Sequence, residues 1–191
     1  MPGDDQTLLS RIASRLTHSA GAGDAAAPSS ILTTTANLYG ARRAGADEDT
    51  SSAFDPEAAA LFEAVVEAAY LVAKADGVFD PTEQAAFQQV VLTACGEAVP
   101  ESQMAAILVD LAGQLEEDGM DKRLRMVART IATPEHAREV LRVAALIAHI
   151  SEGVSEVERE VMVKLAHEFQ LGSEVVDEAI SDVEAALREQ A

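Results

Sequence analysis

The stretch LVAKADGVFDPTE, residues 71–83, recurs in pattern 75 positions later as LIAHISEGVSEVE, residues 146–158. Only a leucine, an alanine and the final glutamate are identical. In each stretch, however, the apolar end of a helix leads into a short turn with glycine, then a capping residue with glutamate three positions later. Two such copies predict an all-α domain with an internal pseudo-repeat of helix–turn–helix units.

Start and stop signals divide residues 54–191 into further helices. Proline follows a capping residue at Asp55, Asp80 and Thr133, which is the usual arrangement at a helix start. No stretch alternates with the period of a strand for long enough to form one. We predict a compact bundle of about seven helices, at about 56–75, 81–95, 100–117, 120–132, 134–150, 155–170 and 173–189.

Residues 1–53 differ in composition from the rest of the chain. Four apolar residues, Leu8, Leu9, Ile12 and Leu16, fall on one helical face and predict about three turns of amphipathic helix. Residues 19–53 are rich in Ala, Gly, Ser, Thr and Asp, which predicts a flexible linker. We therefore divide the chain into an N-terminal segment, 1–53, and a helical domain, 54–191.

The charge is strongly negative and uneven. The 191 residues carry a formal net charge of −19, of which −17 lies in residues 54–191. This charge disfavours nucleic acid and favours cations or basic protein surfaces as partners, unless it only keeps the protein dispersed.

No apolar run is long enough for a membrane span. The single cysteine, Cys95, lies in an apolar stretch, which predicts a buried thiol and a reducing, cytoplasmic location.

The first turn brings three carboxylates close together in sequence, those of Asp76, Asp80 and Glu83. Hard divalent cations such as Ca²⁺ and Mg²⁺ bind oxygen ligands, so these residues are candidate metal ligands. A capping box would by itself account for Asp80 and Glu83. Asp76 has no such role, because the helix dipole disfavours an anion at a helix C-terminus.

The second turn keeps only part of this pattern. Ser151 stands in the place of Asp76, and the acidic residue is displaced by one position to Glu152. Ser155 and Glu158 repeat the capping box. Glu152 and Glu158 are therefore weaker candidate ligands for a divalent cation at this second turn.

The predicted helix at 120–132 is basic. We expect its side chains to pair with neighbouring acidic ones, although they could also form a docking face for an acidic partner. The basic residues are Lys122, Arg123, Arg125 and Arg129, and the acidic ones are Glu116, Glu117, Asp118 and Asp121.

Residues 73–83 and 147–158 resemble the "A-D-G-x-hydrophobic-x-x-x-E" turns of the TerB-like tellurite-resistance family. The resemblance covers about residues 54–186. It implies a bundle of about seven helices in a cytoplasmic bacterial protein, and a role in resistance to tellurite or general chemical stress. It also implies divalent-cation binding by residues that match the motif, which are Asp76, Asp80, Glu83 and Glu158. Ser151 departs from the aspartate of the motif.

Two functions remain open. The first is a non-enzymatic stress protein that binds a divalent cation, Ca²⁺ or Mg²⁺, weakly through its acidic turns. The second is a helical scaffold without a metal that recruits protein partners through residues 1–53 or its acidic surface. We do not expect an enzyme, because no nucleophile–base pair and no cofactor motif can be named.

Overall fold

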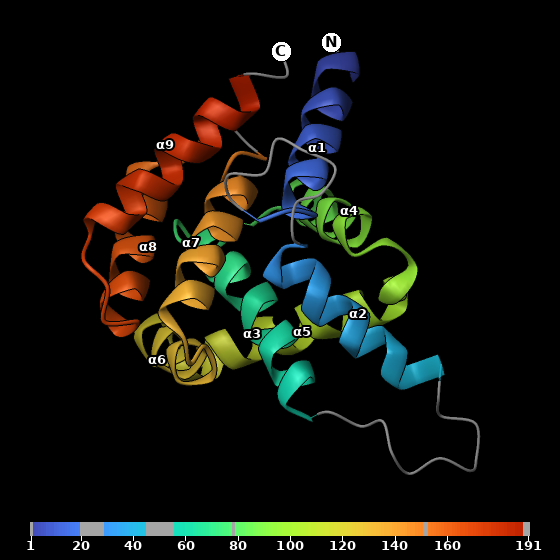
Figure 1. Ribbon diagram of the computed structural model, residues 1–191, viewed down its shortest axis with the longest axis horizontal. Helices are drawn as coiled ribbons and strands as arrows, with labels where there is room; N and C mark the ends of the chain where they lie inside the picture. The colour runs from blue at the N-terminus through green and yellow to red at the C-terminus, as the bar shows by residue number, and fades with distance from the viewer. Residues whose placement is uncertain (1, 20–28, 45–55, 78, 151–152, 189–191) are drawn as a thin grey trace.

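The structure is a computed structural model that describes residues 2–19, 29–44, 56–77, 79–150 and 153–188. These residues form nine α-helices and a short 3₁₀ turn and contain no strand, which confirms the all-α prediction (Figure 1). The elements are α1 (Pro2–Leu16), α2 (Ile31–Ala44), α3 (Pro56–Ala73), α4 (Pro81–Cys95), η1 (Gly96–Ala98), α5 (Glu101–Asp118), α6 (Met120–Thr130), α7 (Pro134–Ala148), α8 (Glu156–Glu168) and α9 (Glu174–Arg188).

Helices α3 and α7 form the centre of the bundle. Helix α3 is buried along most of its length, and α7 is buried at every position from Val140 to Ala148. Helices of this kind are stable in water only when other elements surround them. Helix α3 packs most extensively against α7 and α2, and it also contacts α6, α8 and α5. Figure 1 shows α3 and α7 side by side, with the other helices around them. The core is built mainly from Ala, Val, Leu and Ile, and Phe62 and Phe87 are its largest completely buried side chains.

The seven helices predicted between residues 54 and 191 correspond to α3–α9. Their starts follow the local signals. Asp80, Thr133 and Ser155 are N-caps whose side chains accept hydrogen bonds from backbone N–H groups in the first turn. Gly119, at φ 74°, separates α5 from α6 in a left-handed conformation that favours glycine. Asp55, the predicted cap of α3, lies outside the described residues.

The amphipathic helix predicted near the N-terminus is confirmed as α1. Its Ile12 and Leu16 are completely buried. The linker prediction is wrong over residues 31–44, where the structure describes α2. Two side chains of α2, Leu32 and Tyr39, belong to the same core as α3, and the Tyr39 ring lies 5.0 Å from that of Phe62 between ring centroids.

Propensity alone did not predict α2 because its sequence is rich in Thr and Ala and has no strong apolar face. One local signal was present, since the Ser30 hydroxyl accepts a hydrogen bond from Thr33 N at 3.2 Å, as an N-cap does. Burial against α3 supplies the rest of the stability, as it does for most short helices.

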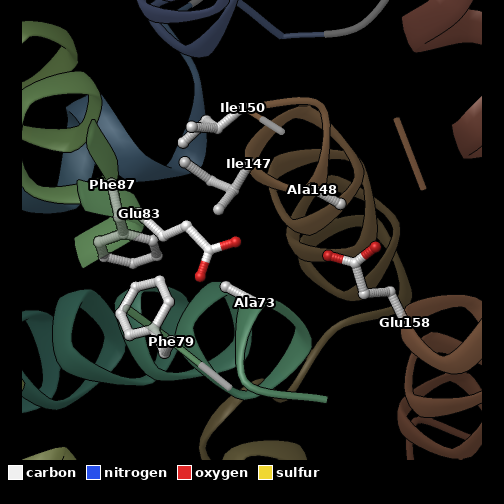
Figure 2. Close-up of a pocket in the computed structure, with 8 residues that line it drawn as sticks. All are labelled: Ala73, Phe79, Glu83, Phe87, Ile147, Ala148, Ile150 and Glu158. Carbon is white, nitrogen blue, oxygen red and sulfur yellow. The ribbon is translucent and has the colours of Figure 1, made fainter. Parts of the chain in front are cut away.

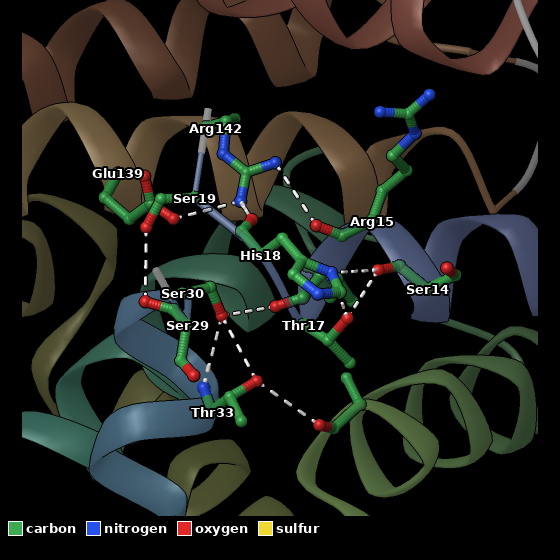
Figure 3. Close-up of polar contacts among 12 residues, drawn as sticks. Ser14, Arg15, Thr17, His18, Ser19, Ser29, Ser30, Thr33, Glu139 and Arg142 are labelled. Carbon is green, nitrogen blue, oxygen red and sulfur yellow. Dashed lines mark hydrogen bonds and ion pairs between the residues drawn. The ribbon is translucent and has the colours of Figure 1, made fainter. Parts of the chain in front are cut away.

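Polar contacts fix the end of α1 against its neighbours (Figure 3). The Arg142 guanidinium on α7 donates hydrogen bonds to the backbone carbonyls of Arg15, at 3.3 Å, and of His18. It also pairs with Glu139 at 2.9 Å. The Ser30 hydroxyl donates to the carbonyl of Leu16. A buried cation therefore satisfies carbonyls at the C-terminal end of α1, where the helix dipole favours positive charge.

Across the described part of the chain, no helix combines the length and apolar character that crossing a membrane requires.

Candidate functional site

The turn between α3 and α4 has the capping box predicted from the sequence. Asp80 Oδ1 accepts hydrogen bonds from Thr82 N at 2.7 Å and from Glu83 N at 2.9 Å. Asp80 N in turn donates to Glu83 Oε2 at 3.0 Å. Both acidic side chains therefore stabilise the start of α4, and Asp80 is largely exposed to solvent.

The turn between α7 and α8 has the second capping box. Ser155 N donates to Glu158 Oε2 at 2.8 Å, and Glu158 N donates to Ser155 Oγ at 3.3 Å. The box uses the same oxygen of its glutamate, Oε2, as the first box does. Within the described residues, no hydrogen bond engages Oε1 of Glu83 or of Glu158.

The tertiary structure brings the two capping-box glutamates to one pocket. Figure 2 shows the carboxylates of Glu83 and Glu158 directed into this space from opposite sides. Both side chains are partly exposed. The pocket has a free volume of about 30 Å³, which is room for one or two water molecules. Two acidic residues 75 positions apart therefore meet in one small space.

Apolar side chains form the rest of the pocket wall. Phe79 and Phe87 lie on the α4 side, and Ile147 and Ile150 lie on the α7 side. The Phe79 and Phe87 rings pack edge to face, with centroids 5.8 Å apart, and each also packs against Tyr70. This rigid aromatic cluster holds the first turn of α4 in place. The sequence pattern predicted the acidic residues of the pocket but not its apolar wall, although Phe79 occupies the hydrophobic position of the motif.

Two of the other predicted ligands, Asp76 and Asp80, do not line this pocket. Asp76 lies at the exposed end of the turn after α3, immediately before Gly77, which has φ 82°. Glu152 falls outside the described residues. Asp76, Asp80 and Glu83 do not converge on one point: the described residues contain no group of three His, Cys, Asp or Glu side chains that could hold a metal ion. Metal binding by the five predicted residues stays a prediction.

A second, larger pocket lies between α3, α5 and α6, with a volume of about 340 Å³. Its floor includes the ion pair between Arg123 and Glu67, in which Arg123 Nε lies 2.6 Å from Glu67 Oε1. Arg123 also contacts Asp118 at 3.2 Å. The hydrogen bonds that Arg123 donates to Glu67, together with the charges of Glu67 and Asp118, raise the pKa of the Arg123 guanidinium above its ordinary value.

The basic helix thus pairs with acidic residues, as its sequence predicts, but only part of this pairing is local. Lys122 bonds Asp118 at 2.6 Å, and this hydrogen bond, together with Arg123, lowers the pKa of Asp118. Asp121 pairs with Lys164 of α8 at 3.7 Å. The buried partner of Arg123 is Glu67, which lies 56 positions away in the sequence. The spacing of residues within one helix could not predict this pair.

Comparisons with protein-family models, with curated proteins and with solved structures find no match to this chain. The resemblance to the TerB-like family therefore stays a prediction that depends on the two motifs.

Proposed function

We propose that this is a non-enzymatic helical protein that binds a hard divalent cation weakly between its two acidic turns. The observation that carries the proposal is the convergence of Glu83 and Glu158 on one pocket. Two carboxylates directed into the same small space repel each other, and a cation between them would relieve this repulsion. The Oε1 atoms are the candidate ligand atoms, because Oε2 of each residue serves its capping box.

The size of the pocket and its few ligands both indicate weak binding. A free volume of about 30 Å³ admits one ion with few accompanying waters. Calcium usually has six to eight oxygen ligands, and two carboxylates supply only part of this set, with water supplying more. We therefore expect a dissociation constant of about 1 mM, at the weak end of protein calcium sites.

Thermal unfolding tests this proposal in the full chain. At about 10 mM CaCl₂, a dissociation constant of about 1 mM adds about 1.4 kcal/mol to the free energy of unfolding. For a protein of this size the melting temperature then rises by about 3–5 °C above that in NaCl of equal ionic strength. MgCl₂ is tested in the same way.

The informative variant is Glu83→Gln/Glu158→Gln. Glutamine still closes a capping box, so the substitutions remove charge while keeping the caps. In EDTA, the loss of repulsion favours the variant and the loss of two acidic charges at helix N-termini disfavours it, so the response to calcium is the decisive measurement: CaCl₂ should no longer stabilise the variant. Glu156→Gln is the matched control, since Glu156 lies in the same first turn of α8 but is largely exposed and does not line the pocket. Equal stabilisation of the wild type and the double variant by CaCl₂ would refute the proposal.

The remaining predicted ligands are tested separately. Asp76→Asn and Asp80→Asn should leave the calcium response unchanged, because neither side chain lines the pocket and asparagine still caps α4. A loss of response in Glu152→Gln would identify Glu152 as a third ligand.

The biological role that we propose, resistance to tellurite or chemical stress in a bacterial cytoplasm, is based on the TerB-like resemblance. Expression of the chain in a tellurite-sensitive bacterium should raise the tellurite concentration that stops growth. If the cation site serves this role, Glu83→Gln/Glu158→Gln should abolish the protection at equal protein levels, whereas Glu156→Gln should retain it.

The alternative function is a scaffold for protein partners. Burial of Ile12, Leu16 and Leu32 argues against recruitment by the apolar faces of α1 and α2, because the core already covers them. The negative charge of residues 54–191 still supports recruitment of a protein partner through the acidic surface.

A further inference from the structure

The pocket between α3, α5 and α6 has the size of a small-molecule site and a wall of mixed apolar, polar and charged side chains. Its volume, about 340 Å³, lies within the range of small-molecule pockets, about 300–1,000 Å³. Three helices supply side chains at spacings of three and four residues, so each helix presents one continuous stripe. These stripes include Ala64 and Glu67 on α3, Ile107 and Leu111 on α5, and Arg123 and Met126 on α6.

The floor of this pocket combines apolar side chains with a paired cation and anion, so it carries no net charge. Ala64, Ile107 and Leu111 are buried, and the Met126 side chain at the mouth is 40% exposed. Arg123 is the only basic group among the lining residues, and Glu67 binds it through two hydrogen bonds, of 2.6 and 2.8 Å. Asp118 adds a third contact to the same guanidinium. An anionic ligand would therefore find no uncompensated positive charge on this floor.

The remaining charge of the pocket is negative. It is carried by Asp110 on α5, an exposed member of the wall. Asp110 makes no ion pair with any residue that the structure describes. The net charge of the whole chain, −19, adds to the field at this pocket. A cation is therefore attracted to the wall, and an anion is repelled from it.

We propose that this pocket binds a small organic cation, with an ammonium or guanidinium group beside Asp110 and an apolar body over Ile107, Leu111 and Met126. The apolar body would remove these side chains from water, and the thioether of Met126 can adapt to its shape. Gln114 and Thr130 offer hydrogen-bond partners around it. This site shares no residue with the pocket of Glu83 and Glu158, so it stands independently of the cation proposal.

Three probes with the same body and different head groups test the inference: 4-phenylbutylamine, 4-phenylbutanol and 4-phenylbutanoate. Each is titrated into the full chain labelled at its Met, Ile and Leu methyl groups and followed by NMR. We expect saturable shifts from the amine at Met126, Ile107 and Leu111. The buried Met162 of α8, which does not line the pocket, should not respond. The alcohol should bind more weakly, and the carboxylate weakest of all.

Asp110→Asn removes the proposed anionic contact without changing the shape of the side chain. It should weaken binding of the amine about three- to fivefold, as expected for an ion pair near the surface, and leave binding of the alcohol unchanged. Glu117→Gln, which removes an exposed charge from α5 outside the pocket, is the matched control and should bind the amine as the wild type does. Absence of saturable shifts at these methyl groups would overturn the inference. So would tighter binding of the carboxylate than of the amine, or equal amine affinities in the two variants.

Discussion

Arg123 on α6 and Glu67 on α3 form a two-pronged ion pair inside the bundle, with each side chain only 9% exposed. Arg123 Nε and Nη2 donate to the two carboxylate oxygens of Glu67 at 2.6 and 2.8 Å. Such a pair gains little net stability over apolar side chains of similar volume, because both charges lose their water. It does fix the position of α6 on the central helix, because Glu67 without Arg123 would be an uncompensated buried charge.

Replacing only one partner of this pair should therefore lower the free energy of unfolding far more than replacing both partners. Arg123→Met leaves Glu67 buried without a partner and should lower the free energy of unfolding by about 3–5 kcal/mol. Glu67→Leu/Arg123→Met should recover most of that loss. Lys122→Met, the control, removes an exposed cation of α6 that pairs with Asp118 at the end of α5, and it should cost less than about 1 kcal/mol. Urea unfolding measures all three, and a loss in Arg123→Met no larger than in Lys122→Met would contradict the prediction.

The N-terminal helices should contribute to the stability of the whole fold. Leu32 on α2 is 1% exposed and lies in the common core, so Leu32→Ala should destabilise the protein by about 2–5 kcal/mol. Leu38, on the same helix, is 50% exposed, and Leu38→Ala should change stability by no more than about 0.5 kcal/mol. Thermal and urea unfolding of the two variants makes the comparison. Similar small effects would mean that α2 is not part of the cooperative core.

Arg142 should hold the end of α1 against α7. Arg142→Met removes its hydrogen bonds to the carbonyls of Arg15 and His18 and leaves Glu139 without its partner. We expect a loss of about 1.5–3 kcal/mol, as for hydrogen bonds that involve a charged group. Amide hydrogen exchange should become faster in α1 than in α8. Arg138→Met, an exposed change one turn earlier on α7, should leave the exchange in α1 unaltered, and the prediction fails if the two variants behave alike.

Cys95 should be unreactive in the folded protein. It should also make the free energy of unfolding decrease at alkaline pH. Burial raises the pKa of its thiol from an ordinary value of 9.0 to about 12. The unfolded chain therefore loses this proton at lower pH than the folded chain does. The contribution of Cys95 to stability is complete below pH 9.0, and it is lost as the pH rises toward about 12.

Two measurements check the thiol prediction. A thiol reagent at about pH 8 should label native Cys95 only at the rate of unfolding, and should label it rapidly in urea. Cys95→Ala should show a smaller decrease in stability above pH 9.0 than the wild type does. Rapid labelling of the native protein would contradict the burial of this side chain.

Local signals in the sequence predicted much of the fold. Asp80 with Glu83, and Ser155 with Glu158, form the capping boxes at the expected positions, because such boxes depend only on residues three positions apart. The seven predicted helices correspond to α3–α9 because proline, glycine and apolar spacing mark their limits. Helix α2 was missed because burial of Leu32 and Tyr39 against α3, more than local propensity, stabilises it.

The candidate sites also depend partly on local sequence and partly on tertiary packing. Sequence spacing identified Glu83 and Glu158 separately, but only the packing of the two hairpins places both carboxylates at one pocket. The pocket of Glu67, Asp110 and Arg123 was not predicted at all, since its walls come from three helices that are separate in the sequence.

The sequence by itself thus determined where the helices of residues 56–188 begin and end and which of their residues cap them. These features are set within one helical turn, where the backbone and its nearest side chains interact. The tertiary structure alone decided that α1 and α2 share the core, that Arg123 pairs with Glu67, and which carboxylates face each other. Those outcomes depend on contacts between residues tens of positions apart, and the free energy of burial that selects them arises only when the whole bundle is packed.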